Sequence, residues 1–312
     1  MRIKWLKVII VLLIIAACSV MMSAPSQNVK AQSGSSNQGN SESQNLSGQL
    51  TAALRNRGFT GRIESRLVMR LGRPIDTRLA DLGRIAFHDS LLGLNDDNSC
   101  SGCHAAPVGF GDTQSIAIGV ENNNFVGPHR AGPRNQRRAP MLLNNVFYPR
   151  LMLNSRFASL SGDPFDNSDG FLFPAPEGLS LSFLPHLLTA QAFIPPTERS
   201  EMAGFGPLVP ATNDGIRAAV VGRLNANSEY RQLFASIFSA VRDGGPITYE
   251  MLARAIAEFE FTLTFSDAPI DKFARGDLSA MNDNQKRGAL LFFGKAGCVQ
   301  CHAVSGESNE QF

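Results

Sequence analysis

Two identical five-residue patterns contain the residues best suited to chemistry. The first spans Cys100–His104 and reads C-S-G-C-H, and the second spans Cys298–His302 and reads C-V-Q-C-H. This C-x-x-C-H spacing is the attachment pattern of haem c. Its two thiols bond to the vinyl groups on one edge of the porphyrin, and the adjacent histidine gives a nitrogen ligand to the iron. The sequence therefore predicts two covalently bound haem c groups, attached through Cys100, Cys103, His104, Cys298, Cys301 and His302.

Three other uses of paired cysteines fit less well. Disulfide bridges suit an exported chain, but they do not require a histidine after each second cysteine. A thioredoxin-like redox pair is expected once, beside a β-α-β pattern that this sequence lacks. A structural zinc site could use four cysteines, but its ligands usually lie close in sequence, whereas these pairs are about 200 residues apart.

The fifth cysteine, Cys18, follows an export signal. Residues 1–17 carry three cations and then an apolar run from Val8 to Ala17, which is the pattern of a secretory signal peptide. The run ends like a bacterial lipobox, so we expect Cys18 to carry a lipid anchor. A plain signal peptide and an uncleaved anchor helix remain the alternatives. All three interpretations place the body of the protein outside the cytoplasm, in the periplasm or another extracytoplasmic space. With the lipid anchor, the protein would be tethered to the membrane as a lipoprotein.

Length and composition favour a globular protein with more than one domain. The chain has 312 residues, of which 43% are hydrophobic and 18% are charged. Its formal net charge of +2 becomes −1 without the signal, so no nucleic-acid partner is expected. After the signal, no apolar run approaches the roughly 18 residues of a membrane-spanning helix. Residues 18–50 are rich in Ser, Asn, Gln and Gly, a composition that predicts a flexible tether.

Helical periodicity precedes both cysteine motifs. Apolar residues recur at helical spacing over residues 77–92 and again over residues 247–264. Before the second motif, Asn282 and Gln285 form a capping-box signature for another helix. We therefore predict a mainly α fold with two tandem cytochrome c-like haem domains and long loops. The first domain is expected over residues 51–242, with an insertion at about 161–190, and the second over residues 243–312.

These blocks together carry a family resemblance. From LGRIAFHD through C-S-G-C-H, RRAPMLLNNVF and AIAEFEFTLT to the second motif, the sequence resembles the bacterial di-haem cytochrome c peroxidases, which include the MauG-like enzymes. The resemblance covers about residues 78–302. It implies an oxidoreductase that reduces hydrogen peroxide to water at the first haem. The second haem would pass on electrons from a small donor protein of cytochrome c or cupredoxin type, and a homodimer is left open.

Two alternatives of function accompany this interpretation. One is a MauG-like oxidase that acts on a protein or organic substrate. The other is a tethered electron-transfer cytochrome without peroxidase activity. The family's acid/base motif argues against the second, because a simple electron relay does not need a proton-transferring group.

The resemblance assigns that acid/base role to Glu201, with Gln191 beside it, because Gln191-Ala192 and Glu201-Met202 match the family's Q-A and E-M positions. Cleaving peroxide requires a proton removed from one oxygen and delivered to the other, and a single carboxyl can do both. An apolar pocket raises the pKa of such a carboxyl towards neutral pH, which suits both roles.

The loop of residues 127–140 holds a further candidate ligand. His129 lies one residue off the position of the family's movable distal histidine, and a solvated loop histidine is the equal alternative. The same loop contains four arginines that either face solvent or pair with haem propionates, namely Arg130, Arg134, Arg137 and Arg138.

The sequence departs from the family at three places. Leu153 stands at the position of the family's interhaem Trp, so a tyrosine such as Tyr148 or direct tunnelling would have to carry electrons. Arg138 stands where the family has a calcium-site Asn, so a calcium ion cannot be assumed. The sequence ends ten residues after His302, and we expect the second haem domain to be incomplete there.

The insertion contains residues that could suggest other sites. Its Asp163, Asp166, Asn167 and Asp169 lack the full spacing of a calcium loop. His186 is more readily explained as a packed histidine than as a metal ligand.

Overall fold

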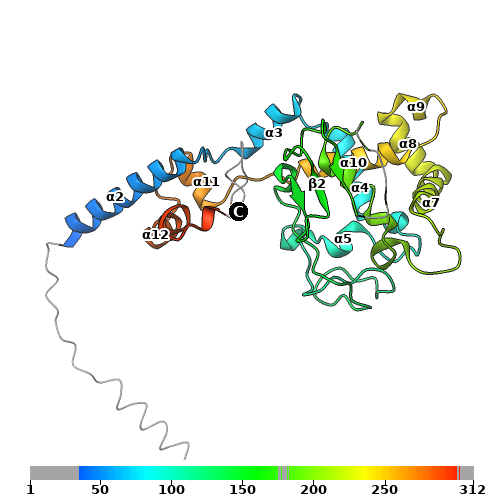
Figure 1. Cartoon of the computed structure of the whole chain (residues 1–312), viewed down its shortest axis with the longest axis horizontal. Coiled ribbons are helices and arrows are strands. Elements are labelled where there is room, and N and C mark those ends of the chain that lie inside the picture. Colours follow the sequence, from blue (N-terminus) through cyan, green and yellow to red (C-terminus); the bar gives the residue numbers. More distant parts are fainter. Residues whose placement is uncertain (1–34, 175–176, 178–180, 182, 301, 303–312) are drawn as a thin grey trace, which may run out of the picture. The chain divides into compact units, whose positions relative to one another are not determined.

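The computed structural model describes residues 35–174, 177, 181, 183–300 and 302. The chain divides into two compact units, residues 1–46 and residues 47–312. The described part of the first unit is the beginning of helix α2 (Ser35–Asn56). The remaining described elements belong to the second unit (Figure 1).

Helices dominate the second unit, and its described strands are short. The helices after α2 are α3 (Ile63–Leu71), α4 (Thr77–His88), α5 (Cys100–Cys103), α6 (Leu187–Gln191), α7 (Asn213–Ala226), α8 (Ser228–Ile237), α9 (Ser239–Arg242), α10 (Tyr249–Phe261), α11 (Pro269–Ala274) and α12 (Asp283–Leu290). Strands β1 (Arg150–Leu151), β2 (Phe157–Ser159) and β3 (Phe171–Leu172) form one antiparallel sheet in the order β1-β2-β3. The predicted mainly α class is confirmed.

Short 3₁₀ and π turns connect these elements. The 3₁₀ turns are η1 (Ser90–Leu92), η2 (Ala106–Val108), η3 (Asn145–Phe147), η4 (Pro195–Thr197) and η7 (Cys298–Gln300), and the π turns are η5 (Arg199–Ala203) and η6 (Leu291–Lys295).

Helices α4 and α10 lie side by side in the second unit (Figure 1). The Asp76 side chain caps α4 by accepting hydrogen bonds from the amides of Arg78 and Leu79, which satisfies donors at the helix start. Gly83 lets the two helices approach, because a Cβ atom there would overlap the carbonyl oxygen of Ala255. Around this contact packs the largest buried apolar cluster, which includes Leu82, Ala86, Leu92, Phe157, Leu224, Phe234, Leu252 and Ile256.

The packing of α10 differs from the predicted domain boundary. The sequence assigns residues 243–312 to a separate second domain, whereas α10 packs against α4, α6 and α7 of the predicted first domain. The physical reason is that ten residues of this helix are buried, and the core around α4 is what buries them. The boundary after residue 242 therefore does not separate two packing units.

Residues 35–50 are helical, whereas the sequence predicts them to be part of a flexible tether. Although this stretch is mostly polar, apolar residues at its end are buried. Leu50 and Leu54 are buried against an apolar cluster that includes Phe59 and Phe273, so the turns that carry them are fixed by packing rather than by helix propensity. Residues 18–34 of the predicted tether, the export signal and Cys18 lie outside the described residues.

The insertion uses its polar residues to hold turns. The Asp163 and Asp166 carboxylates accept hydrogen bonds from the amides of Phe165 and Ser168, at 3.0 and 2.9 Å. His186 caps α6: its Nδ1 accepts from the Leu188 amide and its Nε2 donates to the Val146 carbonyl oxygen, each at 3.0 Å. Both ring nitrogens are engaged and burial lowers its pKa to about 3. His186 is thus a packed histidine.

The predicted capping box at the start of α12 is confirmed. The Asn282 side chain accepts from the Gln285 amide at 2.9 Å, and the Gln285 side chain accepts from the Asn282 amide at 2.8 Å. The regular helix ends at Leu290, and Gly294 interrupts the following π turn with non-helical backbone angles.

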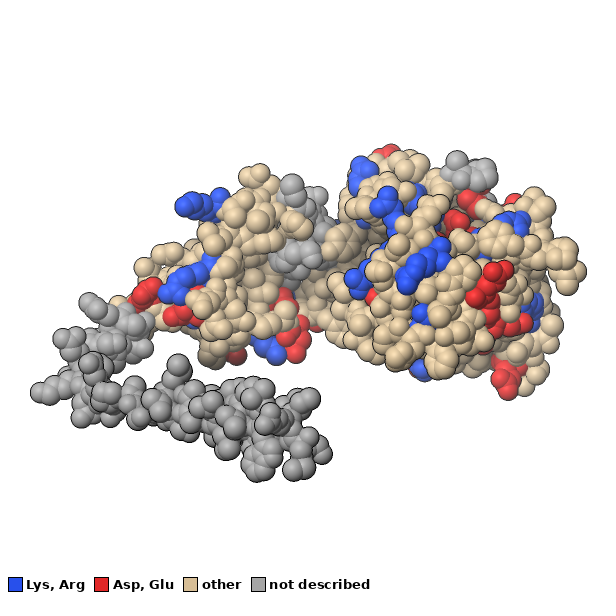
Figure 2. Space-filling view, turned by 90° about the horizontal axis from the view of Figure 1, so that it is seen from below, with Lys and Arg blue, Asp and Glu red and all other residues tan. Residues whose placement is uncertain are grey.

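Neither sign of charge forms a continuous patch on the face shown in Figure 2, where Lys and Arg side chains occur alongside Asp and Glu. This surface does not have the uniform basic character of a nucleic-acid footprint. Within the described residues, no helix combines the length and the apolar character needed to cross a bilayer.

The close approach of α4 and α10 leads to a stability prediction. We expect Gly83→Ala to lower the free energy of unfolding by about 1–3 kcal/mol, because the added methyl group forces the two helices apart. Gly222→Ala in α7 is the matched control, since nothing lies within 4 Å of a Cβ atom there. That change should raise stability by up to about 1 kcal/mol. Urea unfolding of both variants and the wild type checks the expectation, and equal stabilities would contradict it.

Candidate functional site

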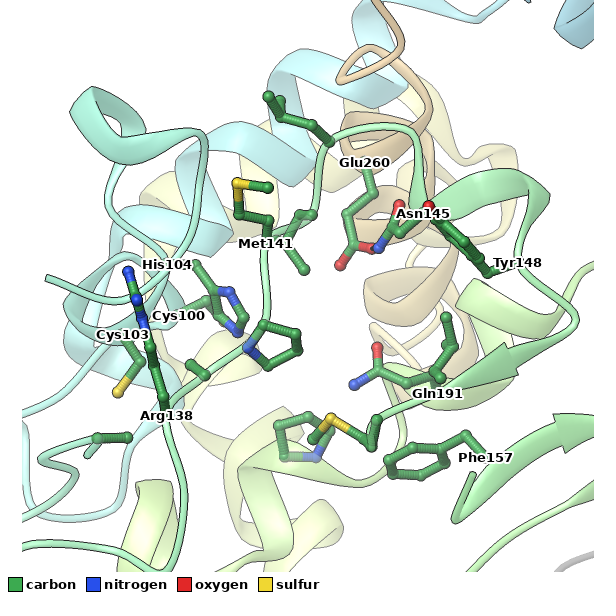
Figure 3. A pocket seen from close by; sticks show the side chains of 18 of the residues that line it. Cys100, Cys103, His104, Arg138, Met141, Asn145, Tyr148, Phe157, Gln191 and Glu260 are labelled. Carbon is green, nitrogen blue, oxygen red and sulfur yellow. Dashed lines mark hydrogen bonds between the residues drawn. The ribbon is translucent and has the colours of Figure 1, made fainter. Parts of the chain in front are cut away.

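The second unit contains a cavity of about 1140 Å³ lined by residues from several distant segments. This volume exceeds the roughly 300–1,000 Å³ of common ligand pockets. Five of the predicted site residues lie on its walls, namely Cys100, Cys103, His104, Gln191 and Glu201. Figure 3 shows the side chains of Cys100, Cys103 and His104 on one side of the cavity and Gln191 on another.

Helix α5 brings the two cysteines of the first motif to one wall. Both thiols are free. Burial raises the pKa of Cys100 to about 12 and that of Cys103 to about 11. Because the two thiols are not joined to each other, both sulfurs are available to a group bound in the cavity.

The His104 imidazole is held in the form that can bind iron. The loop after it turns back through a bridge between Ala105 and Gly111, and this places the Phe110 carbonyl oxygen 3.0 Å from the His104 Nδ1 atom. In the tautomer that carries its proton on Nδ1, this nitrogen donates to that oxygen, and Nε2 is the nitrogen that can bind a metal. Burial lowers the pKa of His104, which keeps the ring neutral.

These features fit a covalently bound haem c. Two free thiols and one neutral imidazole with an available nitrogen lie on the wall of a single large cavity. On the far wall, the Asn145 residue also lines the cavity (Figure 3), so the lining includes polar as well as apolar residues.

Glu201 and Gln191 are carried by two adjacent segments. Gln191 is the last residue of α6, and Glu201 lies in the π turn η5. The pKa of Glu201 is raised to about 7, chiefly by burial and further by the charge of the neighbouring Glu198, while Arg156 acts to lower it. One third of the Glu201 side chain is accessible, but the residue lines the cavity, so a group bound there would cover it.

A buried hydrogen-bond network links the Glu201 segment to the first motif. The Asn98 side chain donates from Nδ2 to the Glu201 carbonyl oxygen at 2.6 Å, and its Oδ1 accepts from Arg130. The Arg130 guanidinium is buried and also donates to the Ile118 carbonyl oxygen at 2.8 Å. Of the four loop arginines, Arg130 is therefore held by hydrogen bonds to other protein groups, whereas the other three line the cavity, namely Arg134, Arg137 and Arg138.

A second carboxyl of the cavity, Glu260, was not predicted from the sequence. It lies in α10, is 5% exposed, and accepts a hydrogen bond from the Asn145 Nδ2 atom at 3.0 Å (Figure 3). Burial raises its pKa to about 7, against which the Asn145 hydrogen bond acts. The sequence did contain a signal for this residue, because Glu260 stands within an apolar helical pattern. A Glu on the buried face of a helix needs a partner.

His129 is not brought to the cavity. Its side chain is exposed and is absent from the cavity walls, and its carbonyl oxygen accepts from the Asn123 side chain. The loop turns this way because it buries the neighbouring Arg130 instead. The structure thus favours the solvated loop histidine over the distal ligand.

The positions where the sequence departs from the family lie at the cavity. Leu153 is 81% exposed and lines the cavity, as does Tyr148. Arg138 donates to the Asp112 carbonyl oxygen at 2.8 Å. No cluster of three or more His, Cys, Asp or Glu suited to a metal ion occurs among the described residues.

The second motif is described only in part. Cys298 begins η7, and the exposed His302 ring lies 6.0 Å from the ring of Phe292. Cys301 lies outside the described residues. Haem attachment at this motif stays a prediction.

Comparison with known proteins points to one family. Residues 77–279 match the family described as di-haem cytochrome c peroxidase. The methylamine utilization protein MauG of Methylorubrum extorquens is 28% identical over 239 residues, which cover 77% of this chain and 53% of that protein. The cytochrome c551 peroxidase of Nitrosomonas europaea is 27% identical over 241 residues, which cover 76% of this chain and 56% of that protein. The chain spans about half the length of these relatives.

A solved structure supports the fold. The crystal structure of a MauG-like protein associated with microbial copper homeostasis aligns with a TM-score of 0.53 and 24% sequence identity. The alignment covers 74% of this chain and 53% of that chain.

The burial of Glu260 leads to a prediction about pH. Its pKa rises from 4.5 to about 7 on folding, so the folded protein holds this proton more tightly than the unfolded chain. The stability that Glu260 contributes is full below about pH 4.5 and is lost as the pH rises through 7. Between pH 5 and pH 8, we expect the wild type to lose about 2–3 kcal/mol of unfolding free energy relative to Glu260→Gln.

Chemical unfolding of the haem-loaded protein at both pH values measures this difference. Glu250→Gln, at the outer end of the same helix beside Arg254, is the control and should follow the wild type. If Glu260→Gln also followed the wild type, Glu260 would not be the group that ionises.

Proposed function

The chain belongs to the di-haem cytochrome c peroxidase family, as the sequence resemblance predicts, and we propose that it reduces hydrogen peroxide to water at a haem c bound through Cys100, Cys103 and His104. The observation that carries this proposal is the meeting of Glu201 and Gln191 with the first C-x-x-C-H motif on the walls of one cavity. These residues come from segments about 90–100 residues apart in the sequence. A cytochrome that only relays electrons has no need of a proton-transferring carboxyl at its haem.

Different residues would hold different parts of the haem. Cys100 and Cys103 form its two thioether bonds, and His104 supplies an imidazole nitrogen whose orientation the Phe110 carbonyl fixes. The cavity-lining Arg134 and Arg137 are candidates for pairing with the propionates. When bound, the haem supplies a redox-active iron that can bind peroxide and deliver electrons to it.

Glu201 performs the proton transfers that peroxide reduction requires. Hydrogen peroxide takes up two electrons and two protons and yields two water molecules. As a carboxylate, Glu201 accepts the proton of one peroxide oxygen. As a carboxylic acid, it returns this proton to the other oxygen while the O–O bond breaks. A pKa of about 7 lets the group take both forms near neutral pH. The Gln191 amide, on the same cavity, orients the peroxide by hydrogen bonding.

The proposal extends to the electron source and the location. A second haem at Cys298, Cys301 and His302 would receive electrons from a small cytochrome c or cupredoxin and pass them to the first. The export signal supports a periplasmic site of action, with Cys18 as the lipid anchor of a tethered protein. The relatives named as cytochrome c peroxidases favour hydrogen peroxide as the substrate.

The MauG-like oxidase is the second candidate, because a relative with that name matches at 28% identity. It would use the same cavity, with an organic or protein substrate as the electron source. Peroxide turnover with a reduced small redox protein, measured against turnover without one, separates the two candidates. Rapid peroxide loss only in the presence of the donor supports the peroxidase.

Substitution of Glu201 tests the proton-transfer role. We expect Glu201→Gln to lower peroxide turnover by at least about 100-fold, because the amide cannot exchange the proton, while the haem absorption spectrum stays unchanged. In the wild type, kcat/KM for peroxide should fall about tenfold for each pH unit below 7, since the carboxylate is the form that starts the reaction. Glu229→Gln, an exposed change on α8, is the control. Wild-type turnover in Glu201→Gln would rule out the assigned role.

Haem content tests the attachment sites separately. We expect the double variant Cys100→Ala, Cys103→Ala to lose one covalent haem per chain, measured as the pyridine haemochrome after acid-acetone extraction of unattached haem. The double variant Cys298→Ala, Cys301→Ala should also lose one, and all four changes together should lose both. Unchanged haem content in the first variant would exclude this cavity as an attachment site.

A further inference from the structure

One cation lies between two carboxylates on the cavity wall. The Arg156 Nη1 atom is 3.3 Å from Glu198 Oε1, and its Nη2 atom is 3.6 Å from Glu201 Oε1. All three residues line the cavity. The family resemblance assigns a role to Glu201 but none to the other two.

We propose that Arg156 is a positioning residue that divides its guanidinium between Glu198 and Glu201 and thereby sets the fraction of Glu201 that is ionised. This inference rests on the proposed function, in which Glu201 exchanges protons with peroxide. It assigns Glu198 the complementary task of holding Arg156 partly away from Glu201.

The backbone fixes this arrangement from both sides. The Glu198 carbonyl oxygen accepts from the amides of Glu201, Met202 and Ala203, so the two carboxylates stand three residues apart on one tight turn. Arg156 immediately precedes β2, and its guanidinium lies 5.1 Å from the centre of the Phe157 ring. The aromatic face restricts where the guanidinium can move.

Proton exchange changes the charge of Glu201, and Arg156 lies beside a carboxylate both before and after this change. When Glu201 is ionised, the three groups carry a net charge of −1, and when Glu201 is protonated they are neutral. In both states Arg156 keeps Glu198 as a partner, so no partly buried cation is left unpaired. A single Arg–Glu pair would instead hold Glu201 as a carboxylate, because an opposite charge at this distance lowers a carboxyl pKa.

The other charged groups around Glu201 are engaged elsewhere. The charge of Glu201 acts on Cys100 and Cys103 of α5. Haem attachment would convert both thiols to thioethers, which do not titrate. On the segments that pack against η5, Asp97 accepts from the Glu121 amide, and Arg130 is held by backbone carbonyls and Asn98. Arg199 donates to the Pro210 carbonyl oxygen. Arg156 and Glu198 are thus the charges that act directly on Glu201.

Two substitutions with opposite expected effects test the proposal. Arg156→Gln removes the attraction, so the ionisation of Glu201 should shift to higher pH by about one unit. Glu198→Gln removes a like charge and releases Arg156 to Glu201, so the ionisation should shift to lower pH. A residue that only maintained the fold would not give shifts of opposite sign. Arg156→Lys keeps the cation and should stay close to the wild type, and Arg254→Gln removes an exposed cation of α10 as the control.

The readout is the cyanide affinity of the ferric, haem-loaded full chain as a function of pH. Hydrogen cyanide loses its proton on binding, so its affinity has an inflection where a neighbouring base ionises. The inflection should vanish in Glu201→Gln and move in opposite directions in Arg156→Gln and Glu198→Gln. An inflection that survives in Glu201→Gln, stays fixed, or moves the same way in both variants overturns the proposal.

Peroxide turnover, measured on the same samples, distinguishes this proposal from the proposed function. If the wild type does not reduce peroxide but the inflection moves as expected, the proposed function fails and the role of Arg156 stands. If peroxide is reduced through Glu201 but the inflection does not move, the role of Arg156 fails alone.

Discussion

The side chain of Asn98 bonds at once to the segment that carries Glu201 and to the buried Arg130, and the geometry of the cavity depends on this contact. Asn98 stands two residues before Cys100, so it ties the start of helix α5 to the segment that carries Glu201. A buried guanidinium is costly unless its donors are satisfied, and the carbonyl oxygens that satisfy Arg130 also fix the course of its loop. Gly102 leaves the space for this network, because a Cβ atom there would overlap Asn98.

Two carboxyls of the cavity have a pKa near 7, and burial is the main cause for each. Their surroundings nevertheless suit them to different tasks. Glu201 lies between charged groups that respond to its ionisation, whereas Glu260 has the neutral Asn145 amide as its partner. An ionised Glu201 therefore has the Arg156 cation beside it, whereas an ionised Glu260 would have only a neutral amide as its hydrogen-bond partner. This difference favours Glu201 for repeated proton exchange and a neutral state for Glu260.

Local patterns in the sequence were sufficient to predict the helices around residues 77–88 and 249–261 and the capping box at Asn282, because those features depend on neighbours within one or two turns. Motifs were sufficient to single out the residues of α5, Gln191 and Glu201, which lie on the walls of one cavity and whose roles stay predictions. Contacts between distant segments were not predictable in this way. The packing of α10 on α4, the partners of Arg156 and the exposure of His129 depend on how remote parts of the chain meet, and no single stretch of sequence records that.

The two thiols of α5 line the cavity, and their raised pKa bears on the stage at which the proposed haem would be attached. Thioether formation requires a nucleophilic sulfur, and in the folded chain the raised pKa values of Cys100 and Cys103 keep both sulfurs protonated. In the unfolded chain the same thiols are solvated and ionise far more readily. On the proposal that a haem c is attached here, attachment would therefore be easier before the final packing of α4, α5 and α10 than after it.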